Sequence, residues 1–300
     1  MRKSLLLALM SIIFGTGATF AQAAGENTFE GEVTADIASV QKVKTQVLTK
    51  NLLAKIILKR VMKKVENSGY YTGNYTATTI AKGNKTRTFT PYNNMYTIVE
   101  KNGNQLKTTT YFPYVKKGYY SNTDMTQNQQ QMEMMKKGTV EKTGQTMTIL
   151  GYKCDVYKVK YEITTDSAGT KSTTNMHCEY AITQDPSLPD HDKEVLPGVK
   201  GVPLKFVTNV VSQTSSEKVL NMDVLMYLAS VVKDVKKRSV DDSEVTVPSD
   251  IKLIDADKDP KNMLKIVEEN GKYMKKKGLW KESAPDDVKI YDNLNEDWEY

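Results

Sequence analysis

The sequence predicts an α+β protein built mainly from an antiparallel β-sheet, with a helix near each end of the exported chain. Three hairpin signals carry this prediction: a Gly-Asn turn at 81–86, an Asn-Gly pair at 100–105 and a turn at 115–120. Tyr- and Thr-rich segments separate these turns, as expected for strands of a meander. A helical spacing of apolar residues within 38–66 and the pair Asp259-Pro260 predict the two helices.

Residues 1–23 have the three parts of a secretory signal peptide. Arg2 and Lys3 precede an apolar run from Leu5 to Phe14, and the segment ends in the A-x-A pattern at Ala21–Ala23. No Cys follows the apolar run, so the lipobox of a lipid-anchored protein is missing. We therefore expect a cleaved signal peptide and export to the periplasm of a Gram-negative envelope, with an uncleaved membrane anchor as the alternative.

Charge is distributed unevenly along the mature chain. Cleavage removes two of the 42 basic residues and none of the 36 acidic ones, which leaves a net charge of +4. The segment Val40–Glu66 is strongly basic, whereas Asp286–Tyr300 is strongly acidic. The two segments could pair with each other, or the basic one could contact a membrane surface; no nucleic-acid partner is expected.

The segment 38–66 is predicted to be one helix. Val40, Val43 and Val47 recur at helical spacing, and a second stripe follows from Leu58 onward. Between the stripes, "LLAKIIL" (52–58) is apolar almost all round, which predicts burial inside a curved sheet. A basic amphipathic helix lying on anionic lipid is the alternative.

The remaining elements follow from alternation and turn chemistry. An 18-residue polar segment at 121–138 contains Met125, Met132, Met134 and Met135, and is predicted to be a loop or short helix at a rim, with an adaptable apolar surface or, alternatively, a soft copper site. Four prolines in 185–203 predict a long connection. The other predicted elements are strands at 28–37, 146–163, 172–183, 204–214 and 242–255, and a helix from Pro260 to about Lys276. Residues 217–237 fit both a helical stripe and the alternation of a strand, and we favour a strand because the meander is unfinished there.

The only cysteines, Cys154 and Cys178, flank the turn "TTDSAGTK". Apolar residues change phase near Val156 and Tyr157, which predicts a β-bulge there and directs both thiols to the same face. A turn shifted by one residue would place the two cysteines opposite each other. We expect a structural disulfide in an oxidising compartment, with two buried free thiols or a reactive pair as alternatives.

Sequence motifs for catalysis are missing. There is no nucleophile elbow, zinc-protease helix, phosphate-binding loop or dinucleotide fingerprint, and the chain has only two histidines. The D-x-D-x-D spacing from Asp255 fails as a calcium loop because Pro260 and Ile266 stand where Gly and Glu are needed. His191 between two aspartates is no more than a weak cation site. We expect a non-enzymatic protein with no cofactor and no metal.

The order of these elements resembles the LolA-like superfamily of envelope proteins. The most specific matches are "ILGYKC" (149–154), "GVPLKF" (201–206) and "VPSDIKL" (247–253), and the resemblance covers about residues 28–255. It implies a LolA-like half-barrel over 24–255: an unclosed, curved antiparallel sheet whose concave face is covered by helices and holds acyl chains. Residues 256–300 would be a helical C-terminal extension with an acidic tail.

The functional prediction combines these points. The chain is expected to bind or carry a lipid or the acyl chain of a lipoprotein without catalysis, with peripheral membrane contact; the alternative is an envelope interaction or stress-response module that has a filled core and binds a protein partner. The predicted cavity-lining residues are Leu52, Leu53, Ile56, Ile57, Met134, Met135, Phe206 and Val210.

Overall fold

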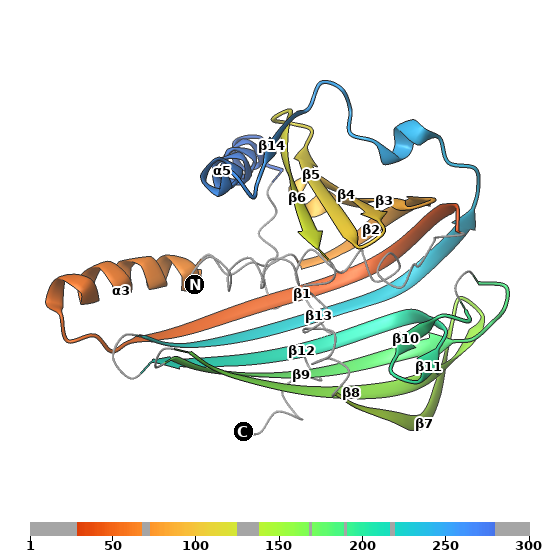
Figure 1. The fold of residues 1–300 in the computed structure, drawn as a ribbon, viewed down its shortest axis with the longest axis horizontal. Helices are drawn as coiled ribbons and strands as arrows, with labels where there is room; N and C mark the ends of the chain where they lie inside the picture. The colour runs from red at the N-terminus through yellow and green to blue at the C-terminus, as the bar shows by residue number, and fades with distance from the viewer. Residues whose placement is uncertain are drawn as a thin grey trace.

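The computed structural model describes residues 29–67, 73–124, 138–167, 170–188, 191–216 and 220–279. The predicted signal peptide, Met134, Met135 and the acidic tail lie outside these ranges. Within them the chain forms a large, curved, unclosed sheet and two α-helices (Figure 1). The prediction of a mainly antiparallel, unclosed sheet is therefore confirmed.

Twelve strands form the sheet, in the spatial order β14-β6-β5-β4-β3-β2-β1-β13-β12-β9-β8-β7. Neighbouring strands are antiparallel, and the exception is the parallel pair of β14 and β6. The strands are β1 (Gly31–Val47), β2 (Gly73–Lys82), β3 (Lys85–Thr90), β4 (Met95–Asn102), β5 (Gln105–Phe112), β6 (Lys117–Asp124), β7 (Thr139–Ile149), β8 (Tyr152–Ser167), β9 (Thr170–Thr183), β12 (Val202–Ser216), β13 (Leu220–Lys237) and β14 (Lys252–Asp255).

Local turn chemistry sets the meander as predicted. Gly83 and Gly103 adopt positive φ angles of 56° and 58° in the turns that join β2 to β3 and β4 to β5. Glycine reaches this left-handed region without the steric cost that a Cβ would add. The hairpin signals in the sequence are therefore confirmed at both places.

Two 3₁₀ helices, one α-helix and a small hairpin pack on the sheet at separate places. The 3₁₀ helix η3 (Asp242–Val245) places Val245 beside Ile80 of β2. Helix α5 (Pro260–Lys276) packs Ile266 against Met95 and Phe112, next to the 3₁₀ helix η2 (Pro91–Asn93). A small hairpin, β10 (Glu194–Leu196) with β11 (Val199–Lys200), lies within the long connection 185–203.

The prediction of one helix over 38–66 is wrong in its first half. Strand β1 continues to Val47 and pairs with β13 along its whole length, and helix α3 (Leu52–Asn67) starts only after it. Asn51 caps this helix, since its Oδ1 accepts a hydrogen bond from the Ala54 N–H at 3.1 Å. The β-branched residues of β1 suit a strand, and pairing with a distant strand overrides the helical spacing of the three valines.

Candidate functional site: the apolar face of the long strands

Strands β8, β9, β12 and β13 share one face whose side chains align in rows across the sheet. Alternate residues of a strand point to the same side, and opposite residues of paired strands are neighbours. We call this surface the central face. Its three rows are Tyr161–Met176–Val210–Met226, Val159–Cys178–Thr208–Leu228 and Tyr157–Tyr180–Phe206–Ser230, and the last row continues to Ile37 of β1 and Tyr75 of β2.

The central face is buried and mostly apolar. Val210, Met226 and Leu228 are buried, and the rings of Tyr180 and Phe206 pack with centroids 4.9 Å apart. The few polar groups satisfy each other: the Cys178 thiol donates to the Thr208 hydroxyl at 3.2 Å. An acyl chain or another hydrophobic group is the kind of ligand that such a surface would accept.

Burial keeps the titratable groups of this face neutral. It raises the pKa of the Cys178 thiol to about 11, although hydrogen bonds with Thr208 and Tyr180 oppose the shift. Burial, with the nearby Cys178 as a second cause, raises the pKa of Tyr161 to about 12. Since thiolates and tyrosinates are disfavoured here, the central face carries no charge at neutral pH.

The hairpin β10–β11 covers one part of the central face. Leu196 packs with Tyr157, Val159 and Cys178 in one buried cluster, and Val195 and Val199 lie against it. Tyr161 and Met176 of the first row also belong to this cluster or pack against it, whereas Val210 and Met226, which are buried too, belong to none of the clusters formed by the described residues. The β12–β13 part of the face is therefore the part that lies outside the cluster of the hairpin.

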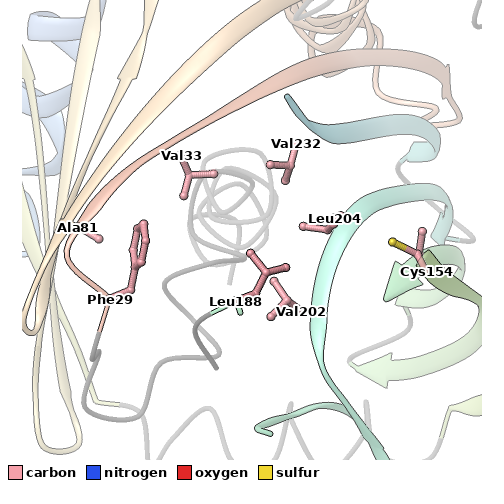
Figure 2. Close-up of a cluster of buried hydrophobic side chains, with 9 residues drawn as sticks. Phe29, Val33, Ala81, Cys154, Leu188, Val202, Leu204 and Val232 are labelled. Atoms are coloured by element: carbon pink, nitrogen blue, oxygen red, sulfur yellow. The ribbon is translucent and has the colours of Figure 1, made fainter. Parts of the chain in front are cut away.

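A second buried cluster closes one end of the curved sheet. Leu188, from the long connection after β9, lies between Phe29 and Val33 on one side and Val202 and Leu204 on the other (Figure 2). This packing brings the start of β1 against the start of β12. The opposite ends of the long strands lie near α3 (Figure 1).

The predicted cavity-lining residues fall into three groups. Phe206 and Val210 both lie on the central face, two rows apart. The four apolar residues of α3 do not join them: they are exposed, so the expectation that 52–58 is buried inside the sheet is wrong. Their exposed fractions are 72% for Leu52, 73% for Leu53, 51% for Ile56 and 61% for Ile57. Met134 and Met135 lie outside the described residues.

The cysteine prediction is also wrong in its geometry. Cys154 and Cys178 are both buried free thiols. Val159 pairs with Cys178 in an unbroken ladder, so Cys154 is five positions away along β8, roughly 17 Å at a rise of about 3.3 Å per residue. An odd separation also places the two thiols on opposite faces. The pair Ser167–Thr170 sets the turn one residue later than the sequence suggested.

The prediction of a bulge in β8 near Val156 and Tyr157 is wrong, since β8 pairs with β9 without interruption there. An irregularity occurs instead on the neighbouring strand β7. Lys142 of β7 pairs with Tyr157 and Thr146 pairs with Asp155, so three residues of β7 face the single residue Val156. The Thr143 hydroxyl donates to the Val156 carbonyl at 3.0 Å and fills the irregular position. The phase change seen in β8 reflects burial of both its faces, since Cys154, Val156, Tyr157 and Val159 are all buried.

Sequence reasoning missed a polar groove on the opposite face of the same strands. The groove has a volume of about 450 Å³, and its lining alternates along each strand with the side chains of the central face. Its residues include Lys44, Lys171, Gln213 and Asp223. The sequence signal for this groove was the polar run of Ser, Gln and Thr in 211–216. Within the described ranges, no three His, Cys, Asp or Glu side chains gather in a way that could hold a metal ion.

Comparison with known proteins does not identify a family. No protein-family model and no curated protein matches the chain. A solved structure of PNGF-II shows 12% identity over 79% of this chain, with a TM-score of 0.32. A structure of Neisserial surface protein A (NspA) shows 8% identity over 70% of this chain and 100% of its own, with a TM-score of 0.11. The chain spans 33% of the PNGF-II chain. Both TM-scores are too low to support an argument about fold or function.

Proposed function

We propose that this chain is an exported, non-catalytic protein of the periplasm that binds a lipid, or the acyl chain of a lipoprotein, along the central face. The observation that carries the proposal is the apolar pair Val210 and Met226, which continues the row of Met176 beyond the cluster that contains the hairpin β10–β11. The resemblance to the LolA-like superfamily supports the same function. In that interpretation the unclosed sheet corresponds to the half-barrel of the superfamily.

Apolar burial would supply the binding free energy. Each methylene group removed from water contributes about 0.8 kcal/mol, and part of the total offsets the cost of ordering the chain. No charge on the central face would compete for a headgroup, because Cys178 and Tyr161 stay protonated. The headgroup would remain in water outside the central face.

A second candidate function is an interaction module with a filled core. The packing of Leu196 against Val159 and Cys178 favours it, since this part of the central face is already occupied. In that case the protein would bind an envelope protein partner, and the row through Val210 would be ordinary core. The two functions differ in whether a hydrophobic probe can enter beside β12 and β13.

Binding of a fluorescent fatty acid, 11-(dansylamino)undecanoic acid, to the exported full chain tests the proposal. Val210→Phe adds bulk to the central face, whereas Leu225→Phe adds it to the opposite face of β13, where Leu225 is 39% exposed. We expect micromolar binding by the wild type, at least a tenfold loss in Val210→Phe and no change in Leu225→Phe. Met226→Phe adds less volume and provides a second variant if Val210→Phe does not fold.

Each outcome distinguishes the two functions. Loss of binding in the folded central-face variants supports the ligand-binding function. Failure of the wild type to bind the probe, together with a ligand-free mass for protein purified from its own envelope, overturns it and favours the filled-core module. Native mass spectrometry gives that mass, and circular dichroism verifies the fold of each variant.

A further inference from the structure

Helix α3 follows the part of strand β1 that pairs with one described strand instead of two. Strand β2 pairs with β1 only from Gly31 to Ser39, whereas β13 pairs with it to Val47. Along its far half, β1 therefore pairs with one strand only among the described residues. The chain turns back after β1, and α3 projects from the end of the long strands (Figure 1). A helix beside an exposed strand edge protects it from pairing with another chain.

The two sides of α3 differ in exposure. Ala54, Leu58 and Met62 are partly buried, and their spacing places them on one side of the helix. Leu52 and Ile56 lie on the opposite side and are 72% and 51% exposed. Leu53 and Ile57 lie between the two sides and are 73% and 61% exposed. A helix in water normally directs such residues toward a core, so this exposed apolar side indicates a partner.

The same exposed side is cationic further along. At 100° per residue, Lys59, Arg60 and Lys63 follow the sector of Leu52 and Ile56, one to two turns later. All three basic residues are exposed. The stretch 44–65 contains no Asp or Glu. The helix therefore presents an apolar first half and a basic second half to solvent.

We propose that α3 docks on the surface of an anionic lipid membrane. Its first two turns enter the boundary between headgroups and acyl chains, and Lys59, Arg60 and Lys63 contact the lipid phosphates. Long Lys and Arg side chains suit this position because their stems cover apolar surface while their charges stay in water. Polybasic segments are attracted to anionic leaflets in the same way.

The positive charge of α3 favours an anionic membrane, rather than a second copy of the chain, as its partner. Two copies of α3 facing each other would bring together like charges, with Glu66 as the one acid of each helix to balance five basic residues. Neither described helix combines the length and apolar content needed to cross a membrane. The docking is independent of the ligand proposed for the central face.

Vesicle co-sedimentation tests the proposal, with vesicles of phosphatidylcholine alone and of phosphatidylcholine with 30% phosphatidylglycerol. The variant Leu53→Asp/Ile57→Asp changes the exposed side of α3. The matched control Leu264→Asp/Val267→Asp makes the same charge change on α5, where these residues are 50% and 40% exposed. Both variants alter exposed positions, so both should fold.

We expect the wild type to bind the anionic vesicles at least tenfold more tightly than the neutral ones, with release in 0.5 M NaCl, a roughly threefold rise over physiological salt. The α3 variant should lose at least tenfold in binding, and the α5 control should stay within twofold of the wild type. Absence of binding, equal binding to both vesicle types, or equal losses in both variants overturns the proposal. A dimer that dissociates only in the α3 variant also overturns it, because the partner is then a second copy.

Binding of the fluorescent fatty acid separates this proposal from the first one. The α3 variant should still bind the soluble probe, because Leu53 and Ile57 are not on the central face. If vesicle binding is lost and probe binding is kept, the two functions reside on different surfaces. If the α3 variant binds vesicles normally, the docking proposal fails, whatever the probe shows.

Discussion

Helices α3 and α5 are almost equal in length, yet they use their apolar residues in opposite ways. Helix α5 buries Met263, Ile266 and Met274 against the sheet, and Tyr273 stacks on Tyr114 with ring centroids 5.1 Å apart. Helix α3 exposes the apolar residues of its first two turns. The contrast shows that α5 is part of the folded core, whereas the outer side of α3 is available to a partner.

The largest expected effect concerns the buried side of α5. Ile266→Ala should lower the free energy of unfolding by about 3 kcal/mol, because it removes apolar contacts with Met95 and Phe112 and leaves a cavity. Ile57→Ala in α3 should change it by less than about 0.5 kcal/mol, because that side chain is already in water. Urea denaturation measures both. A loss of similar size in Ile57→Ala would mean that α3 is also part of the core.

The next largest loss of stability is expected from a buried polar contact of α5. The side-chain amide of Asn270 donates to the Asn93 carbonyl at 2.9 Å and joins α5 to η2. Asn270→Ala leaves that carbonyl without its donor, which should cost about 2 kcal/mol. Glu268→Ala, on the exposed side of the same helix, is the control and should stay within about 0.5 kcal/mol. Equal urea-denaturation midpoints for the two variants would show that the contact does not stabilise the packing of α5.

Local signals in the sequence predicted α5 but not the extent of α3. The pair Asp259-Pro260 sets the start of α5, and its end at Lys276 was also predicted. The start of α3 depends on how far β1 pairs with β13, which lies about 190 residues away in sequence. No local pattern encodes that pairing, and the spacing of Val40, Val43 and Val47 fits a helix as well.

The candidate site shows the same limit. Alternation in 204–214 placed Phe206 and Val210 on one face, and alternation in 176–182 placed Cys178 with Tyr180. Joining these faces into rows requires the register of each strand pair. A turn one residue later than expected was enough to separate Cys154 from Cys178. Residue types and periodicity therefore predict faces, while registers decide which residues meet.

The helix caps allow a finer comparison of the two helices. Asp259 accepts a hydrogen bond from the Asn262 N–H at 3.1 Å, and Asn51 makes the same contact with the Ala54 N–H. Loss of either cap should cost about 1 kcal/mol. We expect Asp259→Ala to lower the global free energy of unfolding. Asn51→Ala should instead speed amide hydrogen exchange within α3 alone, because that helix opens locally. A global loss in Asn51→Ala would contradict the difference.

The smallest expected effect is the salt dependence of stability, which should differ between variants of the two helices. The Lys117 ammonium lies 2.8 Å from the Glu269 carboxylate and joins β6 to α5, but both side chains are about half exposed. Glu269→Gln should therefore lower stability by less than about 1 kcal/mol in dilute buffer and by less still in 0.5 M NaCl. Among the described ion pairs none involves α3, so Lys59→Gln should leave stability unchanged at either salt concentration. The same variant should weaken binding to anionic vesicles. A stability loss in Lys59→Gln that disappears in salt would instead assign the basic side of α3 to contacts within the protein.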